Sequence, residues 1–308
     1  MSWLKAHRFL ILRRVCQLLI LTLFVLGNYS IATLKSVQTK RDVGIFGGNI
    51  ESLLGDSSSV VAKSQSAFSS IVQGNLSYAE WFGGAIKLTD PLAFLQIFLA
   101  GGGVALDMLL GLLVVVVLYG VFLGRVFCAF VCPVNLLTDS AAFLRKKLRL
   151  NSAQRQLSLS RHARYVLLAL TLILSALCGV AVFELVSPIG VFSRGAVFGM
   201  GFGVCVLVAV FCFDLFVLKN GFCGHICPLG AAYALIGRFA LLRVRHKVAN
   251  CTKCMECVRI CPEPEVLKPI GKEDGALKAM ACLRCGRCVE VCADNALEFG
   301  ILNLKEKR

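Results

Sequence analysis

Two cysteine runs decide the fold of the C-terminal part: Cys251-Thr-Lys-Cys254-Met-Glu-Cys257-Val-Arg-Ile-Cys261-Pro262 and Cys282-Leu-Arg-Cys285-Gly-Arg-Cys288-Val-Glu-Val-Cys292. Both read C-x2-C-x2-C-x3-C, the spacing that wraps a 4Fe–4S cluster with thiolates. We expect the short gaps to force a tight coil whose amides point at the sulfides. A zinc site is the alternative, but zinc sites combine two C-x2-C pairs across a longer spacer. The duplicated spacing therefore favours iron–sulfur clusters and electron transfer.

The fourth cysteine of each run is expected to serve the other cluster, as it does in two-cluster ferredoxins. One predicted ligand set is Cys251, Cys254, Cys257 and Cys292. The other predicted set is Cys282, Cys285, Cys288 and Cys261. The sequence thus predicts two 4Fe–4S clusters, held in a small α+β ferredoxin domain over residues 250–308.

Apolar runs dominate the rest of the chain, which has 308 residues and is 57% hydrophobic. About 20 apolar residues span the ~30 Å core of a bilayer as a helix. Four runs reach that length: residues 15–34, 104–123, 165–186 and 196–218. No small-residue cleavage site follows the first run, so we interpret it as a retained helix and not a signal peptide. The predicted fold class is membrane α-helical, with four transmembrane helices and the ferredoxin domain.

The net charge of +15 is distributed unevenly along the chain. Residues 1–14 carry four Lys and Arg and no acid, and residues 125–164 carry eight against Asp139 alone, whereas residues 31–90 carry five of each sign. Positively charged loops stay in the cytoplasm. The expected cytoplasmic segments are 1–14, 124–164, 219–249 and 250–308, and the expected outer loops are 35–103 and 187–195. The charge indicates topology and lipid contact; no nucleic-acid-binding module accompanies it.

A short apolar run over residues 91–100 is expected to form an amphipathic helix on the outer leaflet. It follows Asp90-Pro91, a signal for the start of a helix, and it stops at three glycines, Gly101 to Gly103. The run is too short to cross a bilayer. We therefore expect it to lead through a glycine hinge into the second span.

An internal repeat organises the apolar part. Phe127-Cys128-Ala-Phe-Val-Cys132-Pro133 follows the second predicted span, and Phe222-Cys223-Gly-His-Ile-Cys227-Pro228 follows the fourth. The repeat predicts two pseudo-equivalent pairs of helices whose cysteines meet beneath the bundle. We interpret the four cysteines as a redox or cluster site, and packing roles are the alternative. The spacing leaves a metal, an additional cluster or a disulfide open.

Acidic residues at membrane depth are costly, so they are candidates for function. Glu184 and then Asp107 are the candidate proton acceptors for a quinol, whose oxidation releases two protons. The alternative is an acid at a helix end that pairs with Arg194 or faces headgroup water. Haem is disfavoured because the four histidines lie at or beyond the cytoplasmic helix ends: His7, His162, His225 and His246.

Over nearly its whole length the chain resembles the NapH family of ferredoxin-type membrane subunits. The resemblance rests on Arg13-Arg14-Val-Cys16-Gln17, Leu88-Thr-Asp90-Pro91-Leu92, Arg125-Val-Phe-Cys128, Arg161-His162, Gly221-Phe-Cys223-Gly-His225-Ile-Cys227-Pro228 and Cys261-Pro262-Glu263-Pro264. It implies a quinol dehydrogenase module of the bacterial inner membrane, with both termini in the cytoplasm and the outer loops in the periplasm. It also implies a periplasmic ferredoxin-type partner and electron flow from membrane quinol toward a multihaem c-type cytochrome and nitrate reductase. Ala293 departs from the proline that usually follows such a run.

Two other functions remain open at this point. An assembly or maturation factor would use the same clusters to reduce a metal or a thiol for another enzyme. A non-catalytic anchor would recruit a periplasmic ferredoxin and use its clusters only for stability. The sequence favours the membrane electron-transfer subunit over both.

Overall fold

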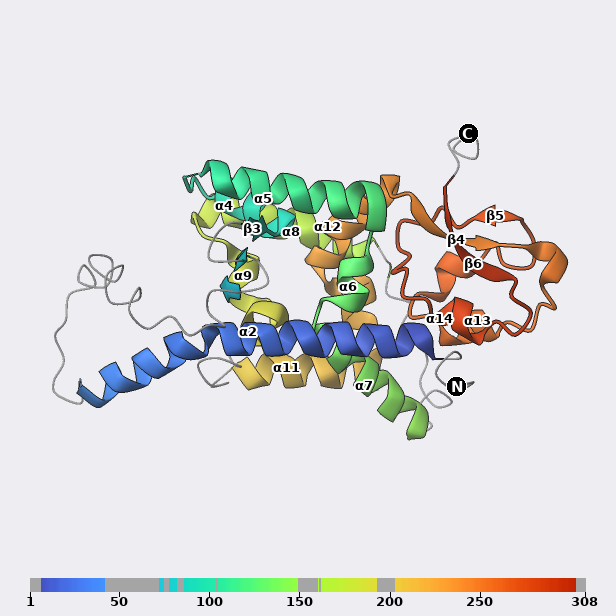
Figure 1. The fold of residues 1–308 in the computed structure, drawn as a ribbon, viewed down its shortest axis with the longest axis horizontal. Helices are drawn as coiled ribbons and strands as arrows, with labels where there is room; N and C mark the ends of the chain where they lie inside the picture. Colours follow the sequence, from blue (N-terminus) through green and yellow to red (C-terminus); the bar gives the residue numbers. More distant parts are fainter. Residues whose placement is uncertain are drawn as a thin grey trace.

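The computed structural model consists of a bundle of apolar helices with a C-terminal α+β domain at one end (Figure 1). It describes residues 7–41, 72–74, 78–81, 86–103, 105–148, 160, 162–192 and 203–302. In Figure 1 the long helices α2 and α5 lie on opposite sides of the bundle, with the shorter helices α6, α9 and α12 between them. The C-terminal domain lies at the ends of α2 and α5.

Within the part of the chain that the structure describes, two helices are long and apolar enough to cross a membrane. The first window, Arg8–Leu26, lies in α2 (Arg8–Arg41), and the second, Leu106–Leu123, combines α5 (Leu106–Val117) with the π-helical turn η2 (Leu118–Leu123). Only 17% of the residues in each window are buried inside the protein. The core helix of a soluble protein would be mostly buried, so the exposed apolar faces of α2 and α5 fit a lipid environment.

The other two predicted spans have shorter helices. Helix α8 (Ala163–Cys178) ends at Gly179, whose φ of 66° favours glycine, and α9 (Val182–Val186) follows as a separate helix. The predicted helix over 165–186 is therefore interrupted. The described part of the fourth run consists of α11 (Gly203–Cys212) and the π-helical η4 (Phe213–Val217). The four-span arrangement stays a prediction.

Helix α4 (Pro91–Leu99) starts where Asp90-Pro91 predicted a helix start. The Asp90 carboxylate accepts hydrogen bonds from the N–H groups of Leu92 at 3.0 Å and Ala93 at 3.1 Å, as an N-cap does. One face of the helix is buried, whereas Leu95, Phe98 and Leu99 are exposed, and its expected place on the outer leaflet stays a prediction. On the buried face, Gln96 is fully buried and accepts a hydrogen bond from the Phe183 N–H at 2.9 Å. This polar contact holds the buried face of α4 against α8 and α9.

Each C-x3-C-P motif leads into a helix that begins at or just after its proline. The first motif joins α6 (Val126–Phe130) to α7 (Val134–Lys147), and the second joins η5 (Phe222–Ile226) to α12 (Pro228–Ile236). Helix α12 lies in the segment 219–249, whose cytoplasmic location stays a prediction, and its small residues and Tyr233 are buried inside the bundle. The reason is its composition, because it is apolar from Pro228 to Ile236.

A small sheet lies between α2 and α4 in the chain, in the segment predicted to be an outer loop. It has the order β1-β2-β3, with β1 at Val72–Gly74, β2 at Tyr78–Trp81 and β3 at Ile86–Thr89, all antiparallel. Gly111 of α5 allows β3 to approach closely, because a Cβ there would overlap the carbonyl oxygen of Lys87. The sheet therefore packs directly on α5.

The C-terminal domain is built on a second antiparallel sheet with the order β5-β4-β6. Its central strand is β4 (Leu242–His246), flanked by β5 (Gly275–Ala276) and β6 (Leu297–Ile301). Two short helices, α13 (Glu256–Ile260) and α14 (Arg287–Val291), follow equivalent cysteines of the two runs. The domain begins at Leu242, earlier than the expected boundary at residue 250, because β4 supplies the centre of its sheet.

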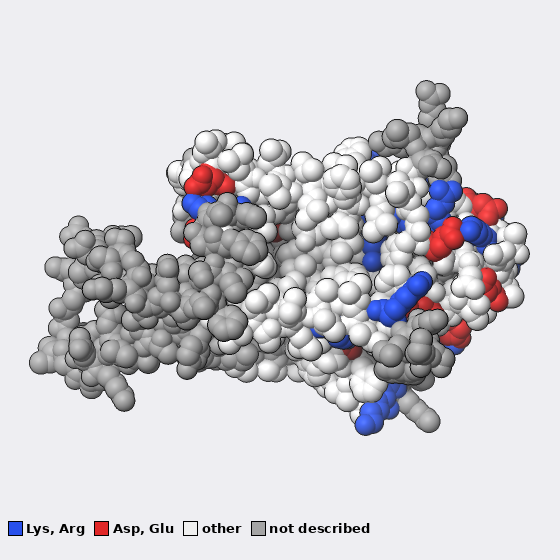
Figure 2. All heavy atoms as spheres, viewed as in Figure 1, with Lys and Arg blue, Asp and Glu red and all other residues white. Residues whose placement is uncertain are grey.

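The charged side chains separate along the long axis of the molecule (Figure 2). Figure 2 shows that most of the Lys, Arg, Asp and Glu in view lie over the C-terminal domain, with a smaller group near the opposite end. The face of the helical bundle between them is almost free of charge in this view. Such a belt fits the hydrocarbon layer of a membrane.

Gly124 lies at the junction of the bundle and the C-terminal domain. Its φ is 64°, and a Cβ there would overlap the guanidinium of Arg284, which donates to the carbonyl of Leu123 at 2.9 Å. We predict that Gly124→Ala lowers the free energy of unfolding by about 1–3 kcal/mol through backbone strain and displacement of Arg284.

Thermal unfolding of the purified, detergent-solubilised protein measures this effect. Gly103→Ala is the matched control, because a Cβ at Gly103 would meet no other atom within 4 Å. Equal midpoints for the two variants would show that the close approach of Arg284 to Gly124 does not contribute to stability.

Candidate iron–sulfur site

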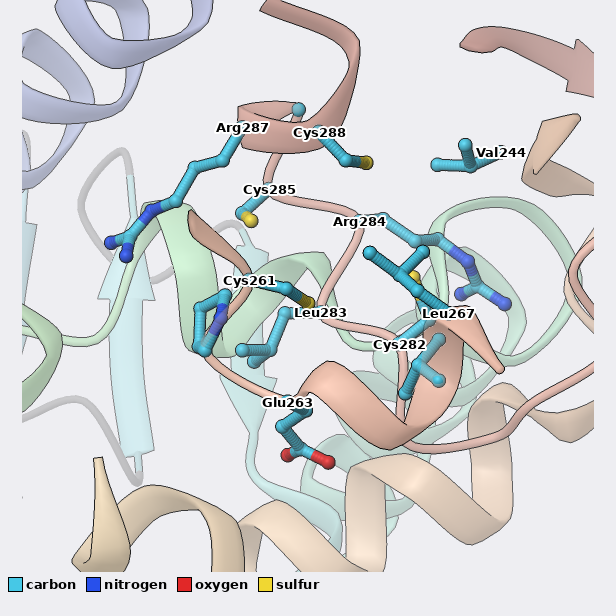
Figure 3. Close-up of a pocket in the computed structure, with 13 residues that line it drawn as sticks. Val244, Cys261, Glu263, Leu267, Cys282, Leu283, Arg284, Cys285, Arg287 and Cys288 are labelled. Carbon is cyan, nitrogen blue, oxygen red and sulfur yellow. The ribbon is translucent and has the colours of Figure 1, made fainter. Parts of the chain in front are cut away.

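Four cysteines surround one cavity in the C-terminal domain, next to the helical bundle. Figure 3 shows Cys261, Cys282, Cys285 and Cys288 around this space, with Arg284 and Arg287 extending away from it. Three of the four belong to the second cysteine run, whereas Cys261 comes from the first. The structure thus brings together the second predicted ligand set, including the exchanged fourth cysteine.

The other four cysteines line a second cavity farther from the bundle. Cys251, Cys254, Cys257 and Cys292 share its walls with His246 and Met255. Among the described residues, no three His, Cys, Asp or Glu side chains are close enough to hold a single metal ion. Zinc binds sulfur at about 2.3 Å and needs such a close group. A 4Fe–4S cluster is held by four cysteines around several iron atoms, and four cysteines line each cavity.

The backbone of the two cysteine runs repeats an uncommon conformation. Lys253 and Met255 flank Cys254 with φ values of 58° and 59°, and Arg284 and Gly286 flank Cys285 with 51° and 79°. Left-handed residues within a turn direct backbone N–H groups toward one point and form anion-binding concavities of the kind found at Fe–S sites. The chain therefore forms the tight coil that the cysteine spacing predicted.

Burial disfavours the charged form of the cysteines in the cavity next to the bundle. It raises the pKa of Cys261 to about 12, and it also raises the pKa values of Cys282 and Cys288. Thiols with such pKa values are protonated at neutral pH unless a cation balances the thiolate. Iron supplies that positive charge, so the donor set and its burial fit a metal cluster.

The cysteines of the two C-x3-C-P motifs meet inside the bundle. Cys132 and Cys227 are buried in one apolar cluster, with Cys128 and Cys223 packed against it. Cys223 lies close enough to interact electrostatically with the other three. Cys223 itself sits in the π-helical turn η5, and such turns occur frequently at functional sites. The predicted convergence is present, but it lies within the bundle and not beneath it.

A buried ion network joins these motifs to the C-terminal domain. Arg125, which precedes the first motif, donates to Glu263 at 3.0 Å, and Arg164 at the start of α8 lies 3.5 Å from the same oxygen. The side chains of all three are at most 4% exposed. Glu263 follows Cys261 by two residues. The network therefore fixes the cavity next to the bundle against the C-x3-C-P motifs.

A second ionic cluster anchors the start of α2. Asp139 of α7 forms ion pairs with Arg13 at 3.0 Å, with Arg14 at 2.8 Å and with Arg287 of the C-terminal domain. Glu290 accepts the N–H groups of Phe9 and Leu10, where a carboxylate stabilises a helix N-terminus. These contacts hold α2, α7 and α14 together.

The two acids predicted as proton acceptors lie in different surroundings. Asp107 forms a 2.6 Å ion pair with Lys87 and is 56% exposed, so it is a paired acid at a helix end, although its partner is not Arg194. Glu184 is half-buried in α9 and lies close enough to Asp90 to interact with it. Arg194 lies outside the described residues.

Sequence reasoning missed an acid and its partner at the centre of the bundle. Asp90 is 7% exposed and accepts a 2.9 Å hydrogen bond from the hydroxyl of Tyr233, which is 1% exposed. Asp90 was interpreted only as the start of a helix, and Tyr233 only as part of an apolar stretch. The signal available for Asp90 was its position, because it is an acid directly before a short, largely apolar helix.

Comparison with known proteins decides the family. The chain is 35% identical to the ferredoxin-type protein NapH of Escherichia coli over 96% of its length and 90% of that protein. It is 36% identical to the methylamine utilization ferredoxin-type protein MauN of Paracoccus denitrificans over 89% of its length and 83% of that protein. This chain belongs to the NapH and MauN family of ferredoxin-type proteins. No solved structure matches it.

A family profile described as a 4Fe–4S binding domain matches residues 104–151 and 198–247. These two segments contain the C-x3-C-P motifs, so the internal repeat found in the sequence is also a repeat of that domain. The match and the family together confirm that the protein is of the ferredoxin type and binds iron–sulfur clusters. The ligands of each cluster stay predictions.

The Glu263 network yields a stability prediction. Glu263→Gln keeps the shape of the side chain but leaves Arg125 and Arg164 buried without a counter-charge, and loss of one partner of a buried pair costs about 3–5 kcal/mol. We expect a clearly lower unfolding midpoint for the purified protein.

Glu298→Gln is the control for this substitution. Glu298 pairs with Lys247 at 2.9 Å, and both side chains are about half exposed. Such a pair is worth roughly 0–1 kcal/mol, so its loss should scarcely move the midpoint. An equal, small effect of both substitutions would contradict the role given to Glu263.

Proposed function

We propose that this protein is the membrane electron-transfer subunit of a quinol dehydrogenase. The observation that carries the proposal is the docking of a cysteine-lined cavity of a ferredoxin-type domain on an apolar bundle that contains four further cysteines. Soluble ferredoxins have no need of such a bundle. A carrier that takes electrons from a lipid-soluble donor needs both parts in contact.

Two 4Fe–4S clusters are proposed, with the ligand sets that line the two cavities. Cys261, Cys282, Cys285 and Cys288 would hold the cluster next to the bundle. Cys251, Cys254, Cys257 and Cys292 would hold the outer one. Each cluster, when bound, supplies a one-electron carrier. Arg125, Arg284 and Arg287 lie near the inner set and would offset its negative charge.

An additional centre is proposed at Cys128, Cys132, Cys223 and Cys227. Its support is the convergence of the four thiols, their position beside Arg125, and the profile match over both segments. This group lies within the bundle and is linked to the inner cavity through Arg125, whose guanidinium donates to Glu263 and to the Ala281 carbonyl. A redox centre here would shorten the path between a donor in the membrane and the domain.

The proposed location is the bacterial inner membrane, crossed four times, with both termini in the cytoplasm. The exposed apolar faces of α2 and α5 and the charges gathered at the C-terminal domain support it. The resemblance to the NapH family supports a periplasmic ferredoxin-type partner and electron flow toward a multihaem c-type cytochrome of a nitrate reductase system. The similarity to a methylamine utilization ferredoxin-type protein supports an electron carrier of a type that more than one electron-transfer system uses.

Iron and sulfide analysis with redox-titrated EPR tests the cluster assignment. We expect about eight iron atoms per chain from two clusters, or about twelve if the additional centre is a cluster. Cys285→Ser should remove or perturb the signal of the inner cluster and Cys254→Ser that of the outer one. Cys178→Ser, an exposed cysteine of α8, is the control and should change neither. Unchanged iron content and EPR signals in the first two variants would refute the ligand sets.

Reduction of the clusters by a quinol tests the function itself. We expect menadiol or decylubiquinol to reduce the clusters of the anaerobic, detergent-solubilised protein, as followed by EPR. Protein that ignores both quinols but reduces copper or a disulfide would instead be an assembly or maturation factor. Electron flux that survives loss of both clusters would identify a non-catalytic anchor.

A further inference from the structure

A cavity of about 220 Å³ lies in the bundle between the two long apolar helices. Ile20 and Phe24 of α2 form one side, and Val115 and Tyr119 of α5 and η2 form the other. Its walls are apolar and aromatic, and it is larger than the space a few water molecules would fill. Pockets of this kind, with a few polar groups, are typical of sites for small apolar ligands.

Four polar groups converge on this cavity. The Asp90 carboxylate and the Tyr233 hydroxyl, already paired with each other, lie in its wall. Thr89 is 1% exposed, yet its hydroxyl has no hydrogen-bond partner among the described residues. The indole N–H of Trp81, also buried in the wall, likewise has none within that part of the chain. Buried polar groups are normally paired, so these two point to a ligand that pairs with them.

We infer that this cavity binds the ring of a membrane quinol, with Asp90 as the proton acceptor and Thr89 and Trp81 as partners of the ring oxygens. The inference rests on the proposed quinol dehydrogenase function and identifies where it takes place. An aromatic ring with hydroxyl groups at both ends fits an aromatic cavity with polar groups in its wall. The apolar helices on both sides suit a ligand that arrives from lipid.

The position of the cavity suits electron transfer to the cysteine pairs. Phe127 and Val131 line the cavity, and they lie on either side of Cys128 in the chain. The ring of Phe127 stacks on Tyr233 with centroids 4.7 Å apart. Phe127 and Tyr233 pack in the same apolar cluster as the C-x3-C-P cysteines, so a quinol in the cavity would lie against the cluster that holds these cysteines.

Oxidation of the quinol breaks its two O–H bonds and gives a quinone, two protons and two electrons. The two electrons would pass one at a time to the iron–sulfur clusters that the proposed cysteine sets would hold. The Asp90 carboxylate accepts the first proton. The 2.9 Å hydrogen bond from the Tyr233 hydroxyl holds this carboxylate in place. Glu184 of α9 interacts electrostatically with Asp90, and we assign it to take up the first proton so that Asp90 can accept the second. Glu184 thus acts as a relay and does not contact the quinol.

Tryptophan fluorescence tests binding without any enzymatic turnover. The chain has two tryptophans, Trp3 and Trp81, so the Trp3→Phe protein reports on the cavity alone. We expect menadione to quench its emission saturably in the full-length, cluster-loaded protein. In that background, Thr89→Val should weaken the apparent affinity about fivefold, the value of one lost hydrogen bond.

The matched control is Thr22→Val. Thr22 is exposed on α2, and its hydroxyl donates to the Leu19 carbonyl of its own helix, at 2.9 Å. It should leave the quenching curve unchanged. Quenching that does not saturate, or equal affinities for Thr89→Val and Thr22→Val, would overturn the assignment of the cavity.

Asp90→Asn and Tyr233→Phe test proton transfer. Asparagine still caps α4, and phenylalanine keeps the aromatic stack, so both variants should fold and bind their iron. We expect the rate of cluster reduction by menadiol to fall at least tenfold in Asp90→Asn, because a positioned base contributes about 10²–10⁴-fold. Reduction by dithionite should be unchanged.

The outcomes separate this inference from the proposed function. If wild-type clusters are not reduced by quinol at all, the proposed function fails. If they are reduced and Asp90→Asn and Tyr233→Phe react at the wild-type rate, the function stands and the quinol binds elsewhere. If both variants lose their dithionite-reducible clusters, the fluorescence titration decides, because it measures menadione binding directly.

Discussion

The buried carboxylate of Glu263, held by Arg125 and Arg164, is the contact on which the rest of the arrangement depends. Three charges out of water are costly unless they satisfy one another, so the C-terminal domain has one favourable position on the bundle. That position places the inner cysteine cavity next to the C-x3-C-P motifs. The contact therefore fixes how the C-terminal domain sits on the bundle, and the proposed electron path depends on that position.

The same need to pair buried polar groups organises the interior of the bundle. Gln96 joins α4 to α8 and α9, and Asp90 joins α4 to α12 through Tyr233. These bonds hold two short apolar helices within the bundle, although neither is long enough to cross a membrane. The Thr89 hydroxyl and the Trp81 indole N–H, which have no partner among the described residues, lie in the wall of the bundle cavity.

Four features lie in sequence through the molecule: the bundle cavity, the C-x3-C-P cysteines, the inner cavity and the outer cavity. Phe127 and Tyr233 line the first and pack in the same apolar cluster as the second, and the Arg125 contact joins the second to the third. The order suits a carrier that takes electrons from lipid and delivers them to a ferredoxin-type domain. A ferredoxin-type protein NapH and a methylamine utilization ferredoxin-type protein MauN both match this chain over most of their length.

The sequence by itself determined the features that depend on local spacing or on length. Cysteine spacing predicted the tight coils at Cys254 and Cys285, because two-residue gaps leave the backbone few conformations. Apolar length predicted α2 and the α5–η2 helix. Only the tertiary structure decided which acid faces a cavity: Asp107 and Asp90 have the same side chain, but one reaches solvent beside Lys87 and the other meets Tyr233, 143 residues away. Contacts between distant segments leave no periodic signal, so neither that pair nor the Glu263 network could be found in the chain.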